Sequence, residues 1–244
     1  MTTVYDRLGS GYAGFRRPDP RIEEAIWGAL GDAQSVINVG AGAGSYEPTD
    51  RHVVAVEPSL TMIEQRPEGS ADAIQATAGS LPFESDSFDA ALTILSVHHW
   101  RDQAKGLREL RRVARDRVVV LTWDPAWPGF WLTDYVPEIL EIDRSKFPAI
   151  GDFERELGSV TAQTVPIPHD CTDGFLGTYW RRPEAYLDAR VRGAISTFSK
   201  LSDTTTGLAQ LSADLESGNW QRKYGALLKE TELDLGYRLI VADA

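Results

Sequence analysis

The stretch VINVGAGAGSYEP, residues 36–48, joins a hydrophobic run to a turn built from small residues. Its β-branched start, residues 36–39, is typical of a strand buried in a parallel sheet. Gly40, Gly42 and Gly44 lack a Cβ, so the backbone can adopt positive φ and lie against a ligand. This pattern predicts close contact between the main chain and a bound molecule. A tight surface turn with no ligand is the alternative.

The length and composition limit the class of protein. A chain of 244 residues favours one large domain over two independent ones. No apolar run approaches the roughly 20 residues of a membrane span, and no charged-then-apolar leader is visible, so we expect a cytoplasmic protein without membrane contact. The single Cys171 cannot form an internal disulfide, and four scattered histidines offer no zinc spacing, so no metal is expected.

The charge of the chain argues against a polyanionic partner. The formal net charge is −11, whereas nucleic-acid binding rests on clustered Lys and Arg. The densest basic stretch, RELRRVARDR at residues 108–117, has helical spacing with an apolar stripe at Leu107, Leu110 and Val113. We interpret it as a solvated helix face, and nucleic acid is an improbable partner.

Apolar, β-rich runs alternate with turns or helices in the first half of the chain. The runs lie at residues 36–39, 53–56, 90–95 and 118–122. This rhythm predicts an α/β fold with a mostly parallel sheet, helices on both faces, and a ligand site beyond the carboxyl ends of the strands. A leading helix is expected over residues 20–30, and Ser59 and Asp102 are expected to cap the helices that follow them.

The second half has a different pattern. Residues 124–159 are predicted to form an aromatic helical segment with a helix over residues 130–142, followed by a strand at 160–167. The last strand, 237–242, is expected to close an antiparallel edge. Helical patterns at 183–198, 204–215 and 220–232 predict a helical cap, residues 168–235, inserted before that strand. A helical layer that only stabilises the sheet is the alternative.

Glu57 follows the second run, seventeen residues after Gly40. An acid at this strand end can accept hydrogen bonds from both hydroxyls of a ribose, so the glycine turn and Glu57 together predict an adenosine-type ligand. An ordinary surface carboxylate is the alternative. The spacing G-x-G-x-G differs from the dinucleotide fingerprint, and Pro48 leaves room for about one helical turn, so a pyrophosphate would find little helix dipole. S-adenosylmethionine carries no phosphate and fits better than a nicotinamide dinucleotide.

Four blocks resemble class I S-adenosylmethionine-dependent methyltransferases, in particular the bacterial small-molecule group, type 11-like. They are VINVGAGAGSYE (36–47), VVAVEPSLTMIEQRP (53–67), GSLPFESDSFDAALTILSVHHW (79–100) and LRELRRVARDRVVVLTW (107–123). The resemblance implies a Rossmann-like, mostly parallel seven-stranded sheet with an antiparallel last strand, a single methyltransferase domain over residues 1–244, a cofactor-binding core at 36–123 and an amino-terminal lid at 1–20.

The resemblance also implies a set of cofactor-binding residues. Along the chain they are Tyr12, Arg17, Gly40, Ala41, Gly42, Glu57, Pro58, Met62, Thr77, Ala78 and Leu95. The two lid residues would fold over the methionine end, Gly40, Ala41 and Gly42 would line the methionine, and Glu57 would hold the ribose. Pro58 and Met62 would border the adenine, and Thr77 and Ala78 stand where the family binds the adenine amino group and offers a backbone amide. An aromatic or arginine in a disordered tail is the alternative for the lid.

The chain departs from the family pattern at two positions. The family usually has an acid where Thr77 stands, to bind the adenine amino group, so a hydroxyl would have to replace a carboxylate. The family also favours an acid where Asn38 stands, near the cofactor's ammonium. Binding would be weaker, or another group would compensate.

Methyl transfer from a sulfonium needs an aligned acceptor and exclusion of water, and a hydroxyl or amine acceptor also needs a base. His98 and His99 follow the run at 90–95, and we expect only one of them to face inward. His99 is the candidate because family members often keep a histidine before an aromatic there. Packing or a backbone hydrogen bond is the alternative.

Five aromatic residues after the run at 118–122 are candidates for the wall of an apolar acceptor pocket, and ordinary core packing is the alternative. They are Trp123, Trp127, Phe130, Trp131 and Tyr135. The sequence therefore predicts a methyltransferase that acts on a small molecule, with the acceptor atom and the oligomeric state open. The rivals are an enzyme acting on transfer RNA or other RNA, and a non-catalytic protein that binds S-adenosylmethionine or S-adenosylhomocysteine.

Overall fold

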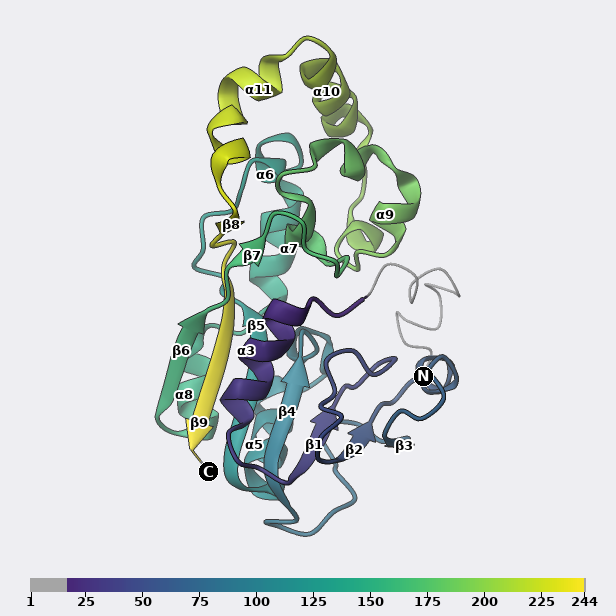
Figure 1. Cartoon of the computed structure of the whole chain (residues 1–244), viewed down its shortest axis with the longest axis vertical. Helices are drawn as coiled ribbons and strands as arrows, with labels where there is room; N and C mark the ends of the chain where they lie inside the picture. Colours follow the sequence, from purple (N-terminus) through teal and green to yellow (C-terminus); the bar gives the residue numbers. More distant parts are fainter. Residues whose placement is uncertain (1–16, 244) are drawn as a thin grey trace.

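The computed structural model describes residues 17–243, which contain a seven-stranded sheet with helices on both faces and a helical layer beyond one end (Figure 1). The strand order is β3-β2-β1-β4-β5-β9-β6. The strands are β1 Ser35–Val39, β2 His52–Val56, β3 Asp72–Ile74, β4 Phe88–Ile94, β5 Ala114–Trp123, β6 Val160–Thr164 and β9 Tyr237–Asp243. Strands β1 to β5 pair in parallel, and β9 runs antiparallel to both β5 and β6. The predicted sheet is confirmed.

Alternation along the strands divides the sheet's side chains between two cores. In β5, Val119 and Leu121 lie in the core beneath α3 (Pro20–Leu30), whereas Val118 and Val120 lie in the core beneath α5 (Gln103–Val113). Successive side chains of a strand point to opposite faces, so a strand that is covered on both sides must be apolar throughout. This is why the parallel strands could be recognised as nearly unbroken hydrophobic runs.

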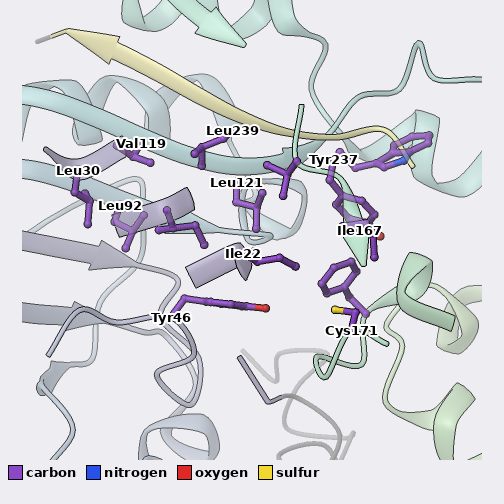
Figure 2. Close-up of a cluster of buried hydrophobic side chains, with 14 of the residues drawn as sticks. Ile22, Leu30, Tyr46, Leu92, Val119, Leu121, Ile167, Cys171, Tyr237 and Leu239 are labelled. Carbon is purple, nitrogen blue, oxygen red and sulfur yellow. The ribbon is translucent and has the colours of Figure 1, made fainter. Parts of the chain in front are cut away.

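Helix α3 covers one face of the sheet as predicted. Asp19 caps it by accepting a hydrogen bond from the Arg21 amide, and Pro20 occupies the first turn, where no amide hydrogen is needed. Ile22, Ile26 and Leu30 are buried on one stripe. Figure 2 shows Ile22 and Leu30 in the same cluster as strand residues of β4, β5 and β9.

Helix α5 covers the other face, together with α8 (Ile150–Leu157). Asp102 caps α5, and Ser59 caps the short helix α4 (Leu60–Glu64), so both predicted caps are confirmed. The predicted apolar stripe of α5 is buried. The basic stretch at residues 108–117 is helical only as far as Val113, where α5 ends, and its last four residues belong to β5.

Two predicted helices are wrong in extent. The helix expected over residues 130–142 is divided into α6 (Leu132–Tyr135) and α7 (Glu138–Lys146), because Pro137 has no amide hydrogen and its ring obstructs the preceding turn. The helix expected over 183–198 consists of the 3₁₀ turn η3 (Pro183–Leu187), the short helix α9 (Ala189–Gly193) and the 3₁₀ turn η4 (Phe198–Lys200). Asp188 starts α9 anew by capping the Arg190 amide.

The remaining helices and strands differ only in detail from the prediction. The pattern at 204–215 is α10 (Thr205–Glu216), whereas the pattern at 220–232 contains α11 (Asn219–Tyr224), η5 (Gly225–Lys229) and the start of a strand. The strand expected at 160–167 is split, because β6 ends at Thr164 and β7 (Ile167–Pro168) pairs with β8 (Glu232–Leu233) outside the main sheet. The turn η2 (Leu176–Tyr179) follows β7.

The helical layer has a hydrophobic core of its own. We call residues 168–235 the cap. Its buried side chains pack against those of α6, of the residue before α6 and of the start of α7, and together they form one cluster that we call the cap core. The cap core consists of Trp131, Leu132, Val136, Ile139, Tyr186, Val191, Ile195, Leu211 and Trp220. In Figure 1 the cap lies beyond the end of the sheet toward which the arrow of β4 points. The carboxyl ends of the parallel strands therefore face the cap.

None of the helices within residues 17–243 combines the length and the apolar character that crossing a bilayer requires.

The contact between α10 and α6 predicts opposite effects of two glycine substitutions. A Cβ on Gly207 in α10 would lie 2.2 Å from the carbonyl oxygen of Tyr135, whereas a Cβ on Gly28 in α3 would have nothing within 4 Å. We expect Gly207→Ala to lower the free energy of unfolding by about 1–3 kcal/mol. Gly28→Ala should raise it by up to about 1 kcal/mol, because alanine has the higher helix propensity. Urea denaturation checks both, and an unchanged midpoint for Gly207→Ala would contradict the close packing of these two helices.

Candidate active site

The glycine turn after β1 is held by its own backbone and by the loop after β4. The amides of Gly40 and Ala41 donate hydrogen bonds to the carbonyl of Val56 at 2.8 and 3.1 Å, which ties the turn to the end of β2. Gly40 has φ +72°, and a Cβ there would lie 1.9 Å from the Oγ of Ser96. The turn thus requires glycine at position 40 both for its backbone conformation and for the close approach of Ser96.

Glu57 connects the glycine turn to the chain after β2. One carboxylate oxygen accepts a hydrogen bond from the Gly42 amide and the other accepts one from the Ser59 amide, each at 2.9 Å. The residue is only 5% exposed. Each oxygen of an ionised carboxylate can accept more than one hydrogen bond. These two amides therefore orient the carboxylate and leave it chemically able to bind a diol.

Asn38 belongs to a buried polar network that the sequence analysis missed. Its Nδ2 donates to Glu47 at 3.0 Å, and Glu47 forms an ion pair with Arg66 at 2.6 Å. Both charged side chains are less than a tenth exposed. Asn38 itself is 1% exposed, and its Oδ1 has no hydrogen-bond partner among the described residues. A buried acceptor of this kind is suited to a donor supplied by a ligand.

The residues proposed around the adenine divide into buried and exposed ones. Met62 in α4 and Ala78 are buried, and the Met62 methyl group would lie 3.4 Å from a Cβ on Gly42. Thr77 is exposed, and its carbonyl accepts a hydrogen bond from Ser80. Pro58 is exposed as well, with its carbonyl bound by Gln75. Of these four residues, Met62 is the one that approaches the glycine turn.

The proposed lid residues lie at or beyond the first described residue. Tyr12 is outside residues 17–243, and Arg17 has an exposed side chain. The chain is anchored just after Arg17, because the fully buried carboxylate of Asp19 accepts hydrogen bonds from the Arg21 guanidinium and the Thr172 amide. Burial by itself raises the pKa of Asp19, but these hydrogen bonds prevail and lower it to about 2. The start of α3 is thus fastened to the cap.

A cavity of about 60 Å³ lies between the carboxyl ends of β4 and β5 and the cap. Its apolar lining comes from the sheet, from the residue after α7 and from the cap, and five polar side chains join it. The lining residues are Leu95, His98, His99, Trp123, Asp143, Phe147, Phe175, Leu176, Ala194, Ile195, Ser196, Thr197 and Tyr237. A mostly apolar, partly open space with a few convergent polar groups is a common form of a small-molecule site.

Both histidines line this cavity, so the expectation that only one of them faces inward is wrong. They belong to the 3₁₀ turn η1 (Val97–His99), and their rings pack against each other instead of pointing to opposite sides. The His98 ring lies between two other rings, 3.8 Å from that of His99 and 3.9 Å from that of Phe147, centroid to centroid. Leu95, just before this turn, has φ +47°, an uncommon conformation for a leucine.

Asp143 is the functional candidate that sequence reasoning missed. It is 6% exposed, lines the cavity, and accepts a hydrogen bond from the Thr197 hydroxyl at 2.9 Å. Burial raises the pKa of Asp143 to about 6, although the Thr197 hydrogen bond and the positive charge of Lys200 act in the opposite direction. One signal was available in the sequence. Asp143 follows the buried Ile139 by four residues in α7, so a carboxylate occupies the helix face that packs inward.

The five aromatic residues predicted as a pocket wall do not act together. Trp123 lines the cavity, while Trp127 and Phe130 line an adjoining void of only about 10 Å³. Trp131 is buried in the cap core and donates a hydrogen bond to the Trp180 carbonyl, and Tyr135 packs against that core and bonds Asp214. Trp131 and Tyr135 therefore pack within the helical layer, as the alternative of ordinary core packing predicts.

Comparison with known proteins identifies the class of enzyme. A family model described as "Methyltransferase domain" matches residues 37–122. A solved structure from Anabaena variabilis ATCC 29413, proposed to be a methyltransferase from an antibiotic biosynthesis pathway, is 34% identical. The match covers 93% of this chain and 98% of that one, with a TM-score of 0.86. The chain therefore belongs to the class I S-adenosylmethionine-dependent methyltransferases and is an enzyme of that class.

More distant relatives match less than half of the chain. A rice enzyme named 2-methyl-6-phytyl-1,4-hydroquinone methyltransferase 2, chloroplastic, is 29% identical over 116 residues, which are 43% of this chain. The uncharacterized methyltransferase YcgJ of Bacillus subtilis (strain 168) is 32% identical over 91 residues, which are 33% of this chain. This chain spans only 33% of the length of the rice enzyme and 36% of that of YcgJ.

Asp143→Asn should make stability less dependent on pH. Folding raises the pKa of this carboxyl from 3.8 to about 6, so its protonation stabilises the folded state below about pH 4, and that contribution is lost as the pH rises through 6. The amide stays neutral and can still accept the hydrogen bond from Thr197. Relative to the unsubstituted protein, the variant should gain about 1–3 kcal/mol of unfolding free energy between about pH 4 and pH 8.

Urea denaturation at both pH values measures this gain. The matched control is Asp116→Asn, which changes an exposed acid of β5 and should give no comparable dependence on pH. A difference between Asp143→Asn and the unsubstituted protein that is the same at both pH values would show that burial does not penalise the Asp143 charge.

Proposed function

We propose that this enzyme transfers a methyl group from S-adenosylmethionine to a small molecule whose reactive end enters the cavity beside Leu95 and His99. The observation that carries the proposal is the position of that cavity, at the carboxyl ends of β4 and β5 and lined on one side by the cap. In open α/β sheets, ligands bind at this edge. The proposal assigns the cap to enclosing the acceptor and residues 36–123 to holding the cofactor.

The residues around the glycine turn fit S-adenosylmethionine. The oriented carboxylate of Glu57 suits a ribose diol, and the buried Oδ1 of Asn38 suits the ammonium of the methionine part. The family usually has an acid at position 38. Here the nearby carboxylate belongs to Glu47, which accepts a hydrogen bond from the Asn38 side chain at 3.0 Å. Arg66 neutralises that carboxylate, so we expect an amide oxygen, rather than a full negative charge, to receive the ammonium.

The same geometry disfavours a dinucleotide. Arg66 is the cation beside the glycine turn, with its guanidinium 3.4 Å from the Gly42 carbonyl, but its charge is already paired with Glu47. The described residues between Gly40 and β2 form turns without a helix, so no helix amino terminus faces the glycine turn from that segment. From residues 40–66, a pyrophosphate would therefore meet no unpaired cation and no helix dipole from the segment before β2.

The chain's own residues would align the acceptor, exclude water and accept a proton. When bound, S-adenosylmethionine supplies an already activated methyl group, so no covalent catalyst is required of the protein. The aromatic walls and the cap would keep the cavity dry. We assign His99 as the base that takes the proton released by a hydroxyl or amine acceptor. His98, held between two rings, would fix the position of His99.

Two observations support a small acceptor over a nucleic acid. The formal net charge of −11 works against a polyanion, and the volume of about 60 Å³ admits only a small chemical group while the cap is in this position. The relative of 34% identity is proposed to be a methyltransferase from an antibiotic biosynthesis pathway, which is compatible with this choice. The cytoplasmic location and the lid function of residues 1–20 stay predictions.

Calorimetric titration with S-adenosylhomocysteine and, separately, with NAD tests the cofactor assignment. We expect binding of S-adenosylhomocysteine alone. Glu57→Gln should weaken this binding at least tenfold, because it removes a charged acceptor and places an NH₂ group against the amide of Gly42 or Ser59.

The control for this titration is Glu64→Gln, which alters an exposed acid at the end of the neighbouring helix α4 and should leave the dissociation constant unchanged. Circular dichroism confirms that each variant is folded. NAD binding without a response to S-adenosylhomocysteine would overturn the assignment, and equal affinities of the Glu57→Gln and unsubstituted proteins would remove Glu57 from the site.

A further inference from the structure

Asp143 is a buried carboxylate to which the proposed reaction gives no role. Its one hydrogen bond with the described residues joins Oδ1 to the Thr197 hydroxyl at 2.9 Å, and within residues 17–243 it forms no ion pair. A carboxylate removed from water without a cationic partner destabilises the fold. The side chain nonetheless lines the acceptor cavity, where a ligand could supply the missing charge.

The polar groups that line the cavity together with Asp143 come from several elements. His98 and His99 belong to η1, Tyr237 to β9, and Thr197, which donates the hydrogen bond to Asp143, to the segment before η4. Lys200 of η4 acts on Asp143 through its positive charge, and burial lowers the pKa of Lys200. This distant charge does not compensate the cost of burying the carboxylate, since the pKa of Asp143 remains raised.

Aromatic side chains surround the same space. Trp123, Phe147, Phe175 and Tyr237 all line the cavity that Asp143 lines. In Figure 2, Tyr237 lies on the same side of the core cluster as Ile167 and Cys171. The faces of aromatic rings attract cations, and the attraction grows where water is excluded. A neutral ligand would leave the carboxylate without a partner, an anionic ligand would be repelled, and a cation would satisfy both the carboxylate and the rings.

We propose that Asp143 binds the methyl acceptor through an amine that arrives protonated, so that the acceptor is a small amine with an apolar body. This rests on the proposed function. The N–H groups of the amine would donate to the carboxylate, whose orientation Thr197 fixes by its hydrogen bond. Asp143 is thus a specificity residue for the acceptor. His99, in the same cavity, would take one proton from the bound ammonium, which frees the nitrogen lone pair for the in-line displacement and leaves the sulfur as a neutral thioether.

The volume of the cavity limits which end of the acceptor fits. A cavity of roughly 150 Å³ is needed to hold a benzene ring. The space of about 60 Å³ therefore accommodates the amine end alone, and a larger body would extend beyond the cavity through its open side. Residues 194–197 of the cap, which connect α9 to η4 without being part of either, belong to the lining.

Binding of matched amines and alcohols tests the proposal. The probes are ethylamine against ethanol and benzylamine against benzyl alcohol, measured at pH 8 by ligand-observed saturation-transfer NMR with and without S-adenosylhomocysteine. The unsubstituted protein should bind each amine at least tenfold more tightly than the matching alcohol. Asp143→Asn should lose at least tenfold in amine affinity and change alcohol affinity less than twofold.

The matched control is Glu141→Gln, an exposed acid on the same helix, which should change neither affinity. If Asp143→Asn does not fold, Asp143→Ala should show the same loss of amine affinity. The preference of the unsubstituted protein for amines over alcohols can be measured without any variant. Equal binding of amines and alcohols, or full amine affinity in a folded Asp143 variant, would overturn the proposal.

Calorimetry with S-adenosylhomocysteine on the same samples distinguishes a failure of the role of Asp143 from a failure of the proposed function. Cofactor binding without amine preference would contradict only the role of Asp143. Absence of cofactor binding would contradict the proposed function itself.

Discussion

The carboxylate of Glu57 holds together the end of the sheet where the site is built. By accepting hydrogen bonds from the amides of Gly42 and Ser59, it joins the turn after β1 to the start of α4. The Gly40 and Ala41 amides reinforce this junction through the Val56 carbonyl. Because the backbone of both turns is fixed by one buried side chain, the groups around the glycine turn are organised without a ligand. Such preorganisation reduces the conformational entropy that cofactor binding would cost.

A second layer of polar groups surrounds this junction and shows how the chain departs from its family. The acid that the family places on the first strand is replaced by Asn38, and the carboxylate appears instead on Glu47, paired with Arg66. At the acceptor end, Asp143 is buried without an ion-pair partner among residues 17–243. The buried charge of Glu47 is compensated by Arg66 within the protein, whereas that of Asp143 is available to a cationic ligand. Proteins commonly retain such unfavourable groups where function requires them.

Sequence patterns predicted most of the sheet and part of the site, for identifiable physical reasons. Unbroken β-branched runs, the apolar stripe of α3 and the capping side chains of Ser59 and Asp102 are local signals that the structure confirms. The cap was less predictable, since short helices and 3₁₀ turns depend on packing around side chains such as Trp131, and Pro137 divides what periodicity alone suggests is one helix. Glu47, Arg66 and Asp143 escaped notice because their roles arise from contacts between segments distant in sequence.

A crystal structure with S-adenosylhomocysteine tests the central claim most directly. The account predicts ribose hydroxyls within hydrogen-bond distance of the Glu57 carboxylate, the ammonium on the Oδ1 of Asn38, and the sulfur facing the cavity lined by Leu95 and His99. A ligand bound elsewhere, with Glu57 still engaged by Gly42 and Ser59 and Asn38 without a new donor, would contradict it.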